Sequence, residues 1–327
     1  MKACWFEAFG AAQNVLQQGE WPTPEPGSGE VLVQLHATGV NPSDVKKRAG
    51  AFTDLLEAGP VIPHSDGAGV ITAVGEGVSP SRVGERVFVY QAQYDRQLGT
   101  AAEYVALDSV RAPTLPENAS FEVGACVGIP IMTAHRCVFA DGPVADQLIL
   151  VPGGAGRVGH YATQWAHRAG ARVIATASNE QDVSACREAG AEAVVNHREP
   201  EWGKAVLDLT GGQKIDRVID VEFGANLPEL LHCVRIGATI ATYSSTLVPE
   251  PSLPFRTMMF MDLTVRMVIV YAMPEAAKAQ AAGDTQAALI EGGLQHRIAE
   301  TLPFDQMAKA HEIIEEGSVR GCVVVTI

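Results

Sequence analysis

Three glycines, Gly154, Gly156 and Gly159, lie between an apolar run at 148–151 and a helical stretch at 160–168. Their spacing is G-x-G-x-x-G. In such a turn the first glycine permits a tight bend, the second lets backbone approach a diphosphate, and the third lets the helix pack closely against the strand. The N-terminus of the helix, with unpaired N–H groups and the positive end of its dipole, would hold the anion. The pattern predicts a dinucleotide-binding site; a turn whose glycines serve packing alone is the alternative.

The residues at the tip of the second apolar run, 172–175, bear on which dinucleotide is bound. Sites for NAD usually place an acid about 20 residues beyond the turn, to bind the ribose 2′-OH. Here the neutral Ser178 and Asn179 stand at that place, and His197 and Arg198 end the next strand. This arrangement favours a 2′-phosphate and hence NADPH. Glu180 and Asp182 would repel the phosphate if they pointed inward; otherwise they are solvated residues at the start of the next helix.

Length and charge limit the remaining possibilities. A chain of 327 residues exceeds the size of one core, so two domains are expected. The formal net charge of −14 argues against general binding to nucleic acid or to an anionic membrane surface. The longest apolar run, 258–273, is interrupted by Asp262 and Arg266 and is not a membrane span.

The six cysteines are scattered and contain no C-x-x-C pair, so they form neither a zinc knuckle nor a disulfide framework. Together with the absence of a cleavable apolar leader, this predicts a soluble protein of a reducing compartment, the cytoplasm.

The elements that would position the glycine turn form an alternating α/β pattern. Strands are expected at 148–151, 172–175, 193–195, 215–221, 238–243 and 263–271, which is the number that a doubly wound parallel sheet requires. Before them, strands at 1–9, 30–40, 67–78, 85–90 and 101–107 have the spacing of a small β-barrel. A last helix at 304–316 precedes a strand at 322–327, which is expected to rejoin the first domain. The predicted domains are 125–271 for the nucleotide, and 1–124 with 272–327 for the barrel.

The whole chain resembles the medium-chain dehydrogenase/reductase superfamily, and within it the zinc-free, zeta-crystallin-like NADPH:quinone oxidoreductase branch. Besides the glycine turn, the stretches that carry the resemblance are GVNPSD at 39–44, SDGAGV at 65–70, GIP at 128–130, TA at 133–134, NHRE at 196–199 and AHE at 310–312. The resemblance implies an α/β protein with a GroES-like substrate domain, a Rossmann cofactor domain and an active site between them.

The residue types at the zinc positions depart from the zinc-dependent relatives. The positions that match their three catalytic ligands hold Asn41, Ser65 and Ile129, none of which makes a zinc site. His64 falls one position before the place of the ligand histidine, and the cysteine-rich lobe that binds structural zinc is absent. We therefore expect no zinc.

The resemblance also implies the site residues. Asn41 would contact the nicotinamide and substrate, and Thr133 would help to hold the nicotinamide; a turn cap and a packing residue are the respective alternatives. Arg157 either reaches a phosphate or lies in solvent. Phe52, near the place of a substrate-facing tyrosine in relatives, and Tyr271 would line the substrate pocket. The full expected cofactor set is Asn41, Thr133, Gly154, Ala155, Gly156, Arg157, Val158, Gly159, Ser178, Asn179, His197, Arg198 and Tyr243.

The expected activity is hydride transfer from NADPH to a quinone, with placement by Asn41 and without a general acid. Reduction of an activated C=C, as in enones or acrylates, would use the same fold and cofactor. A non-catalytic NADPH-binding sensor or structural protein is the alternative of another class. The apolar strand at 263–271 is expected at a sheet edge, where it would pair with its copy in a homodimer.

Overall fold

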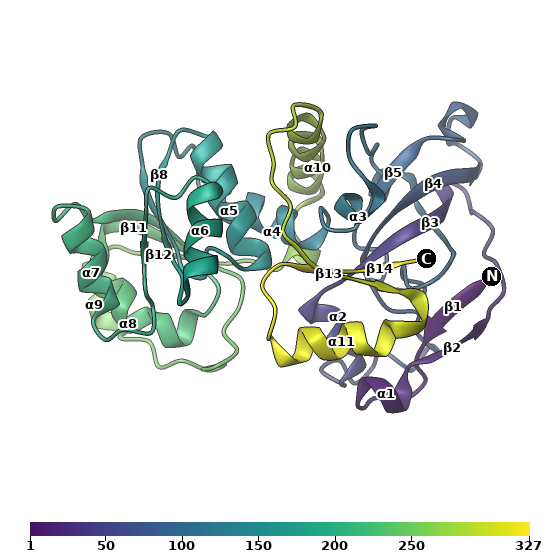
Figure 1. Ribbon diagram of the computed structural model, residues 1–327, viewed down its shortest axis with the longest axis horizontal. Coiled ribbons are helices and arrows are strands. Elements are labelled where there is room, and N and C mark those ends of the chain that lie inside the picture. Colours follow the sequence, from purple (N-terminus) through teal and green to yellow (C-terminus); the bar gives the residue numbers. More distant parts are fainter. The chain divides into compact units, whose positions relative to one another are not determined.

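The computed structural model describes residues 1–327, and the chain divides into two compact units. One consists of Met1–Ile129 and Lys278–Ile327 and is called here the barrel unit; the other, Pro130–Ala277, is called the nucleotide unit. Figure 1 shows the elements of each. The chain passes between the units inside two helices, α4 (Ile129–Phe139) and α10 (Glu275–Ile290).

The nucleotide unit is an alternating α/β structure. Its strands are β7 (Leu148–Val151), β8 (Arg172–Thr176), β9 (Ala193–Val195), β10 (Ile215–Asp220), β11 (Val234–Thr242) and β12 (Thr264–Met267). The intervening helices are α5 (Arg157–Arg168), α6 (Glu180–Glu188), α7 (Trp202–Leu209), α8 (Phe223–Cys233) and α9 (Phe255–Phe260). All neighbouring strands pair in parallel, in the order β12-β11-β10-β7-β8-β9.

This order reverses direction between β7 and β10, as in a doubly wound sheet, and confirms the predicted fold class. Helices α5 and α6 cover one face, and α7 and α8 cover the other (Figure 1). With helices on both faces, the central strands are apolar on both sides, and all four residues of β7 are buried. Ligands of such sheets bind beyond the carboxyl ends of the strands at the reversal, which is where the glycine turn follows β7.

The sheet edge differs from the prediction. A strand over 263–271 was expected, but β12 covers only Thr264–Met267, and Val270–Ala272 forms a 3-10 turn, η3. The ladder ends with the N–H of Val268 donating to Thr242 O at 2.7 Å. Beyond it the chain leaves the sheet, and Val270 and Tyr271 are both buried within the turn. The edge position itself is confirmed.

The barrel unit is built on a mixed sheet in the order β13-β14-β3-β4-β5, with β6 also pairing with β3. Its strands are β3 (Glu30–Val40), β4 (Asp66–Val74), β5 (Arg86–Val89), β6 (Tyr104–Asp108), β13 (Ile298–Pro303) and β14 (Cys322–Thr326), with a separate hairpin of β1 (Lys2–Trp5) and β2 (Gln17–Glu20). Its helices include α1 (Ala12–Val15), α2 (Pro42–Arg48), α3 (Phe121–Gly124) and α11 (Met307–Glu316). Because β14 pairs antiparallel with β3, the last strand rejoins the first domain, as predicted.

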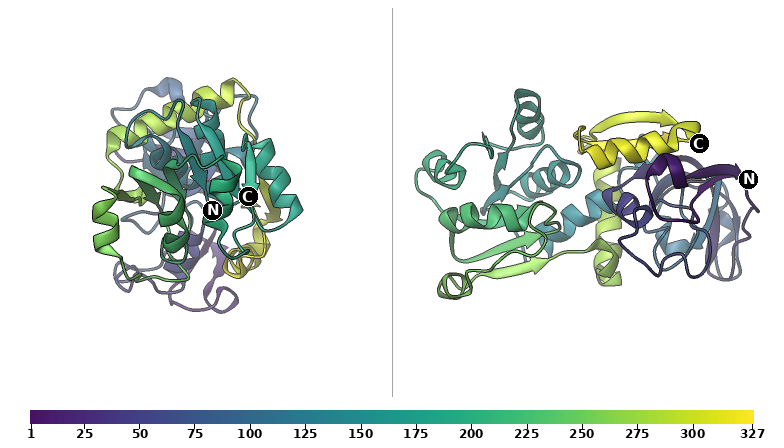
Figure 2. Two further views of the ribbon diagram at one scale, coloured as in Figure 1. Left: turned by 90° about the vertical axis from the view of Figure 1, so that its left-hand side faces the viewer. Right: turned by 90° about the horizontal axis from the view of Figure 1, so that it is seen from below.

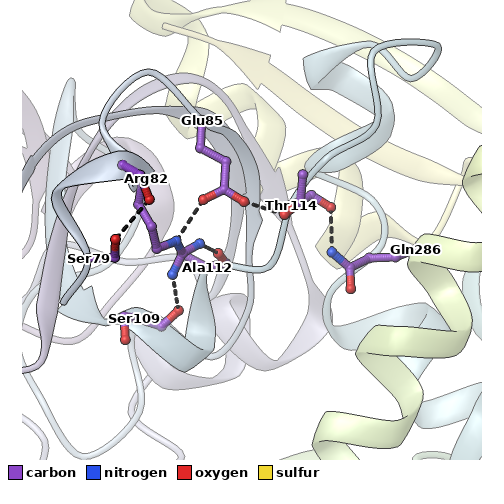
Figure 3. A network of polar contacts seen from close by, with 8 residues as sticks. Ser79, Arg82, Glu85, Ser109, Ala112, Thr114 and Gln286 are labelled. Atoms are coloured by element: carbon purple, nitrogen blue, oxygen red, sulfur yellow. Dashed lines mark hydrogen bonds and ion pairs between the residues drawn. The ribbon is translucent and has the colours of Figure 1, made fainter.

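Polar contacts join α10 to the loops of the barrel unit (Figure 3). Arg82 donates from Nε to Glu85 at 2.6 Å and from Nη2 to Ala112 O at 2.6 Å. The other oxygen of the Glu85 carboxylate accepts from the Thr114 hydroxyl, and Gln286 on α10 donates to Thr114 O at 3.0 Å. These contacts fix the loop that precedes α3.

Both ends of the chain lie in the barrel unit (Figures 1 and 2). All six cysteines are buried free thiols. None of the helices combines the length and the apolar character needed to cross a membrane.

Candidate active site

In the glycine turn after β7, backbone segments lie so close together that side chains would not fit between them. Gly153, at φ +66°, holds the left-handed conformation, so it, rather than Gly154, makes the bend that only glycine adopts easily. A Cβ on Gly159 would lie 2.3 Å from Gly153 O, so no other residue fits there. At Gly156 a Cβ would lie 3.2 Å from Gly153 O, which is a tight contact, and would meet no other atom beyond its chain neighbours within 4 Å. These contacts are consistent with the roles expected of the second and third glycines.

Only some N–H groups of the turn are available to an anion. The N–H groups of Gly153 and Gly154 donate to the Thr176 hydroxyl at 3.0 Å and to Thr176 O at 3.1 Å. The N–H of Gly156 donates to Gly153 O at 2.9 Å. By contrast, the N–H groups of Val158 and Gly159 in the first turn of α5 form no hydrogen bond within the protein. The N–H groups that remain open to an anion are therefore at the helix N-terminus, whereas those of Gly154 and Gly156 are used within the protein.

The residues that follow β8 are neutral, and the nearby acid Asp182 is engaged within the protein. Ser178 is half-buried and Asn179 is exposed. Asn179 caps α6, because its Oδ1 accepts the N–H of Asp182 at 2.9 Å. Its Nδ2 donates to Asp182 Oδ2 at 2.8 Å, and Asp182 is buried. The Asp182 carboxylate is thus held at the α6 N-terminus by the residue that precedes the helix.

His197 and Arg198 follow β9 and differ in their surroundings. His197 is half-buried, with Nδ1 3.0 Å from the Thr176 hydroxyl. The Arg198 side chain is exposed, and its backbone N–H donates to Asn196 Oδ1 at 3.0 Å. Sequence reasoning had not identified Thr176, whose hydroxyl contacts both the glycine turn and His197. The only sequence signal for it was its position as the last residue of the second strand.

Tyr243 and Arg157 are electrostatically linked. Burial raises the pKa of Tyr243, the nearby Asp220 raises it further, and the Arg157 guanidinium opposes this shift. Arg157 itself is half-buried. Asp220, at the end of β10, is fully buried and burial raises its pKa to about 6, although Asn226 Nδ2 donates to its Oδ1 at 2.7 Å. Burial therefore disfavours the ionised forms of Asp220, at the end of β10, and of Tyr243, just after β11.

On α4, Thr133 and His135 are both buried. The His135 ring packs edge-on against Trp165, with centroids 5.5 Å apart, and against Phe139 at 4.7 Å. His135 is thus a packing residue.

In the barrel unit a buried carboxylate fixes Asn41. Asn41 Nδ2 donates to Asp66 Oδ2 at 2.8 Å, and the N–H of Ile129 donates to both carboxylate oxygens of Asp66 at 2.9 Å. Burial raises the pKa of Asp66, against these N–H groups, which favour its ionised form. Gly128 is required beside it, because a Cβ there would lie 2.0 Å from Asp66 Oδ1. Sequence reasoning gave Asp66 no role; an acid opening an otherwise apolar strand was the available signal.

Asp44 holds the backbone of Asn41, accepting its N–H on Oδ2 at 2.8 Å. Burial raises the pKa of Asp44 to about 6, and the charge of Lys47 opposes the shift. Lys47 is itself buried, with Nζ 2.6 Å from Gln93 O and 2.7 Å from Gln93 Oε1. Asp44 is thus closer to its protonation midpoint near neutral pH than an exposed aspartate would be.

The two residues expected to line the substrate pocket belong to different units. Phe52, in the barrel unit, is 53% exposed, and Tyr271, in the nucleotide unit, is 8% exposed. The positions that match the zinc ligands of relatives hold Asn41, Ser65 and Ile129. No three His, Cys, Asp or Glu side chains gather in a way that could hold a metal ion.

Comparison with known proteins agrees with this geometry. Residues 27–117 match the alcohol dehydrogenase GroES-like domain, and residues 158–283 match the family described as zinc-binding dehydrogenase. Human quinone oxidoreductase is 31% identical over 97% of this chain and 95% of its own. The solved structure of a mycobacterial protein complexed with NADPH is similar at 26% identity with a TM-score of 0.87, covering all of both chains. That of an NAD-dependent alcohol dehydrogenase gives 28% and 0.86, also over both full chains.

A GroES-like domain joined to a doubly wound nucleotide-binding sheet defines a medium-chain dehydrogenase/reductase, an oxidoreductase enzyme. The chain belongs to the quinone oxidoreductase branch of that superfamily.

Proposed function

We propose that this oxidoreductase uses NADPH to reduce quinones, without zinc. The observation that carries the cofactor assignment is the first turn of α5. Its N–H groups at Val158 and Gly159 have no acceptor in the protein, and a Cβ at the neighbouring Gly156 would meet only Gly153 O within 4 Å. These features suit a diphosphate. When bound, the cofactor would supply the hydride, and the protein would supply binding and orientation.

The residues at the tips of β8 and β9 support NADPH over NADH. No acid stands where a ribose 2′-OH would need one, and the Asp182 carboxylate is held by Asn179. Arg198 and His197 are the groups that would receive a 2′-phosphate. That a similar mycobacterial protein was solved with NADPH agrees with this, whereas the similar alcohol dehydrogenase is described as NAD-dependent, so the preference needs direct measurement.

Fluorescence titration with both cofactors tests the preference. NADPH is expected to bind more tightly than NADH. Arg198→Ala should weaken NADPH binding by about fivefold and leave NADH binding unchanged, because an exposed charge pair with a phosphate contributes on the order of 1 kcal/mol. Arg187→Ala, an exposed arginine at the other end of α6, is the matched control. Equal or tighter binding of NADH would contradict the proposal.

The substrate class rests on the quinone oxidoreductase relatives and is tested by stopped-flow oxidation of NADPH with a quinone panel and an enone panel. Faster turnover of quinones is expected. Preference for enones or acrylates would indicate an ene reductase instead. Binding of NADPH without turnover of either panel would indicate a sensor or structural protein.

Independence from zinc is proposed because Asn41, Ser65 and Ile129 offer no suitable ligands. Metal analysis of the purified protein should find no stoichiometric zinc, and chelators should leave turnover intact. Loss of turnover on chelation, restored by zinc, would overturn this part of the proposal.

A further inference from the structure

We propose that Thr176 is a positioning residue for the cofactor, which holds the glycine turn in the shape that exposes the first turn of α5 to a diphosphate. The inference rests on the proposed binding of a dinucleotide and adds a residue outside the glycine motif to the site.

Two consecutive N–H groups of the turn are fixed by this one residue. Thr176 is the last residue of β8 and is fully buried. Its hydroxyl accepts the N–H of Gly153 at 3.0 Å, and its carbonyl accepts the N–H of Gly154 at 3.1 Å. The carbonyl bond belongs to any residue at this position, whereas the hydroxyl bond requires Thr or Ser. The hydroxyl therefore adds a constraint at Gly153, the residue with a positive φ.

The turn that is fixed in this way is the one that places the helix. Gly153 O lies where it accepts the N–H of Gly156 at 2.9 Å, and Gly156 is the residue before α5. Gly153 O is also the atom nearest to the position that a Cβ at Gly159 would take. A shift of Gly153 would therefore disturb its contacts with Gly156 and Gly159. Both contacts lie at the start of α5, where Val158 and Gly159 present their N–H groups.

The Thr176 hydroxyl also contacts the residues that follow β9. Its Oγ1 lies 3.0 Å from His197 Nδ1. The hydroxyl thus connects the turn after β7 to the residue after β9, across the tip of β8.

Thr176→Val tests the hydroxyl at nearly constant side-chain volume. It leaves the Gly153 N–H without a partner, so amide hydrogen exchange at Gly153 in the free protein should accelerate at least tenfold. The Kd values of NADPH, NADH and ADP, which share the diphosphate, should all rise by a similar factor of about ten, as expected for one lost buried hydrogen bond. Thr176→Ser, which keeps the hydroxyl, should restore both readouts to within about threefold.

Thr285→Val is the matched control, because Thr285 is a fully buried threonine of α10 whose hydroxyl bonds to Ala281 O of its own helix. It should change neither cofactor affinity nor exchange at Gly153. If Thr176→Val fails to fold, Thr176→Ala is used in its place.

The outcomes separate the two proposals. A wild-type protein that binds neither NADPH nor NADH would refute the proposed function. Wild-type binding together with unchanged Kd values and unchanged exchange in Thr176→Val would refute the positioning role alone. A loss confined to NADPH would also overturn it, because that result would assign the effect to His197 at the 2′-phosphate rather than to the turn.

Discussion

At the scale of single residues, the titratable groups nearest Asn41 are buried carboxylates. Asp44 and Asp66 each accept a hydrogen bond from Asn41 at 2.8 Å, and burial raises the pKa of Asp44 to about 6. Hydride addition to a quinone gives an anion with a basicity near that of a phenol, which takes its proton from water without a dedicated acid. We therefore predict that Asp44→Asn lowers kcat by less than 100-fold, below the range of a general acid. Asn keeps an acceptor for the Asn41 N–H.

The pH profile of kcat completes that test. An acid of pKa about 6 would make kcat fall as the pH rises through 6, and Asp44→Asn would remove that ionisation. A thousandfold loss with such a change in profile would mean that Asp44 donates the proton, and would favour carbonyl or alkene reduction. Tyr94→Phe, at an exposed tyrosine of the barrel unit, and His135→Ala, at the packing histidine of α4, should likewise lower kcat by less than 100-fold.

Gly159 gives a second prediction at this scale. A Cβ there would lie 2.3 Å from Gly153 O, so Gly159→Ala should destabilise the fold by about 1–3 kcal/mol and greatly weaken NADPH binding. Gly283→Ala on α10 is the control, because nothing lies within 4 Å of its Cβ position. That change should stabilise the protein by about 0.5–1 kcal/mol. Thermal unfolding and cofactor titration measure both variants, and an unaffected Gly159→Ala would refute the close-approach argument.

At the scale of elements, a buried histidine pair connects α11 to the segment before β4. His64 Nε2 lies 2.9 Å from His311 Nε2, and His64 Nδ1 lies 2.9 Å from the Thr38 hydroxyl of β3. Burial lowers the pKa of His64 to about 3 and that of His311 well below its usual value, with the charges of His64 and Arg48 adding to the second shift. Only the neutral pair fits this site.

Histidines with lowered folded-state pKa values stabilise the protein fully above their unfolded pKa of about 6.5, and this contribution is lost as the pH falls below it. Between pH 7 and 5 we expect a loss of about 2 kcal/mol per histidine. Asp44, Asp66 and Asp220, whose pKa values burial raises, act in the opposite sense as the pH falls. The contribution of the histidines to the pH dependence of stability must therefore be measured by comparing the wild type with a variant that lacks them.

The double variant His64→Asn, His311→Gln isolates the pair, and Asn tolerates the positive φ of 78° at residue 64. Urea unfolding at pH 7 and pH 5 should show a smaller loss of stability in the variant than in the wild type. Equal losses would show that the pair is protonated in the folded protein.

At the scale of the whole molecule, we propose a homodimer formed through the free edge of the nucleotide unit. β12 is the edge strand, and the exposed apolar residues of this unit include Met267, which is 73% exposed, Ile269, Phe260, Phe255 and Leu247. Arg266, the residue before Met267 on β12, donates from Nε to Asp141 at 2.6 Å and so anchors the strand to its own unit. An apolar edge of this kind favours pairing with a copy, and a twofold axis closes the assembly.

Sedimentation of Met267→Glu tests this assembly. The wild type should sediment as a dimer at micromolar concentration and the variant should shift toward the monomer, because the introduced charges would face each other near the axis. Ile290→Glu, at an exposed apolar position in the barrel unit, should remain dimeric. A monomeric wild type would contradict the proposal.

The sequence by itself determined the fold class, because apolar runs of strand length, the G-x-G-x-x-G turn and the alternation of strands and helices depend on neighbours along the chain. It also placed the last strand in the first domain and the apolar strand at a sheet edge. It overestimated the length of that strand, because the turn at Val270–Ala272, which buries Val270 and Tyr271, is visible only in the packed structure.

The tertiary structure alone decided the residues that hold the site. Thr176 meets Gly153 across 23 positions of sequence, and Asp66 meets Asn41 across 25 and Ile129 across 63. A hydroxyl or carboxylate in an apolar strand gives no sign in sequence of the N–H group it will receive. Its partner is chosen by strand register and by where each strand ends, which exist only once the sheet has formed.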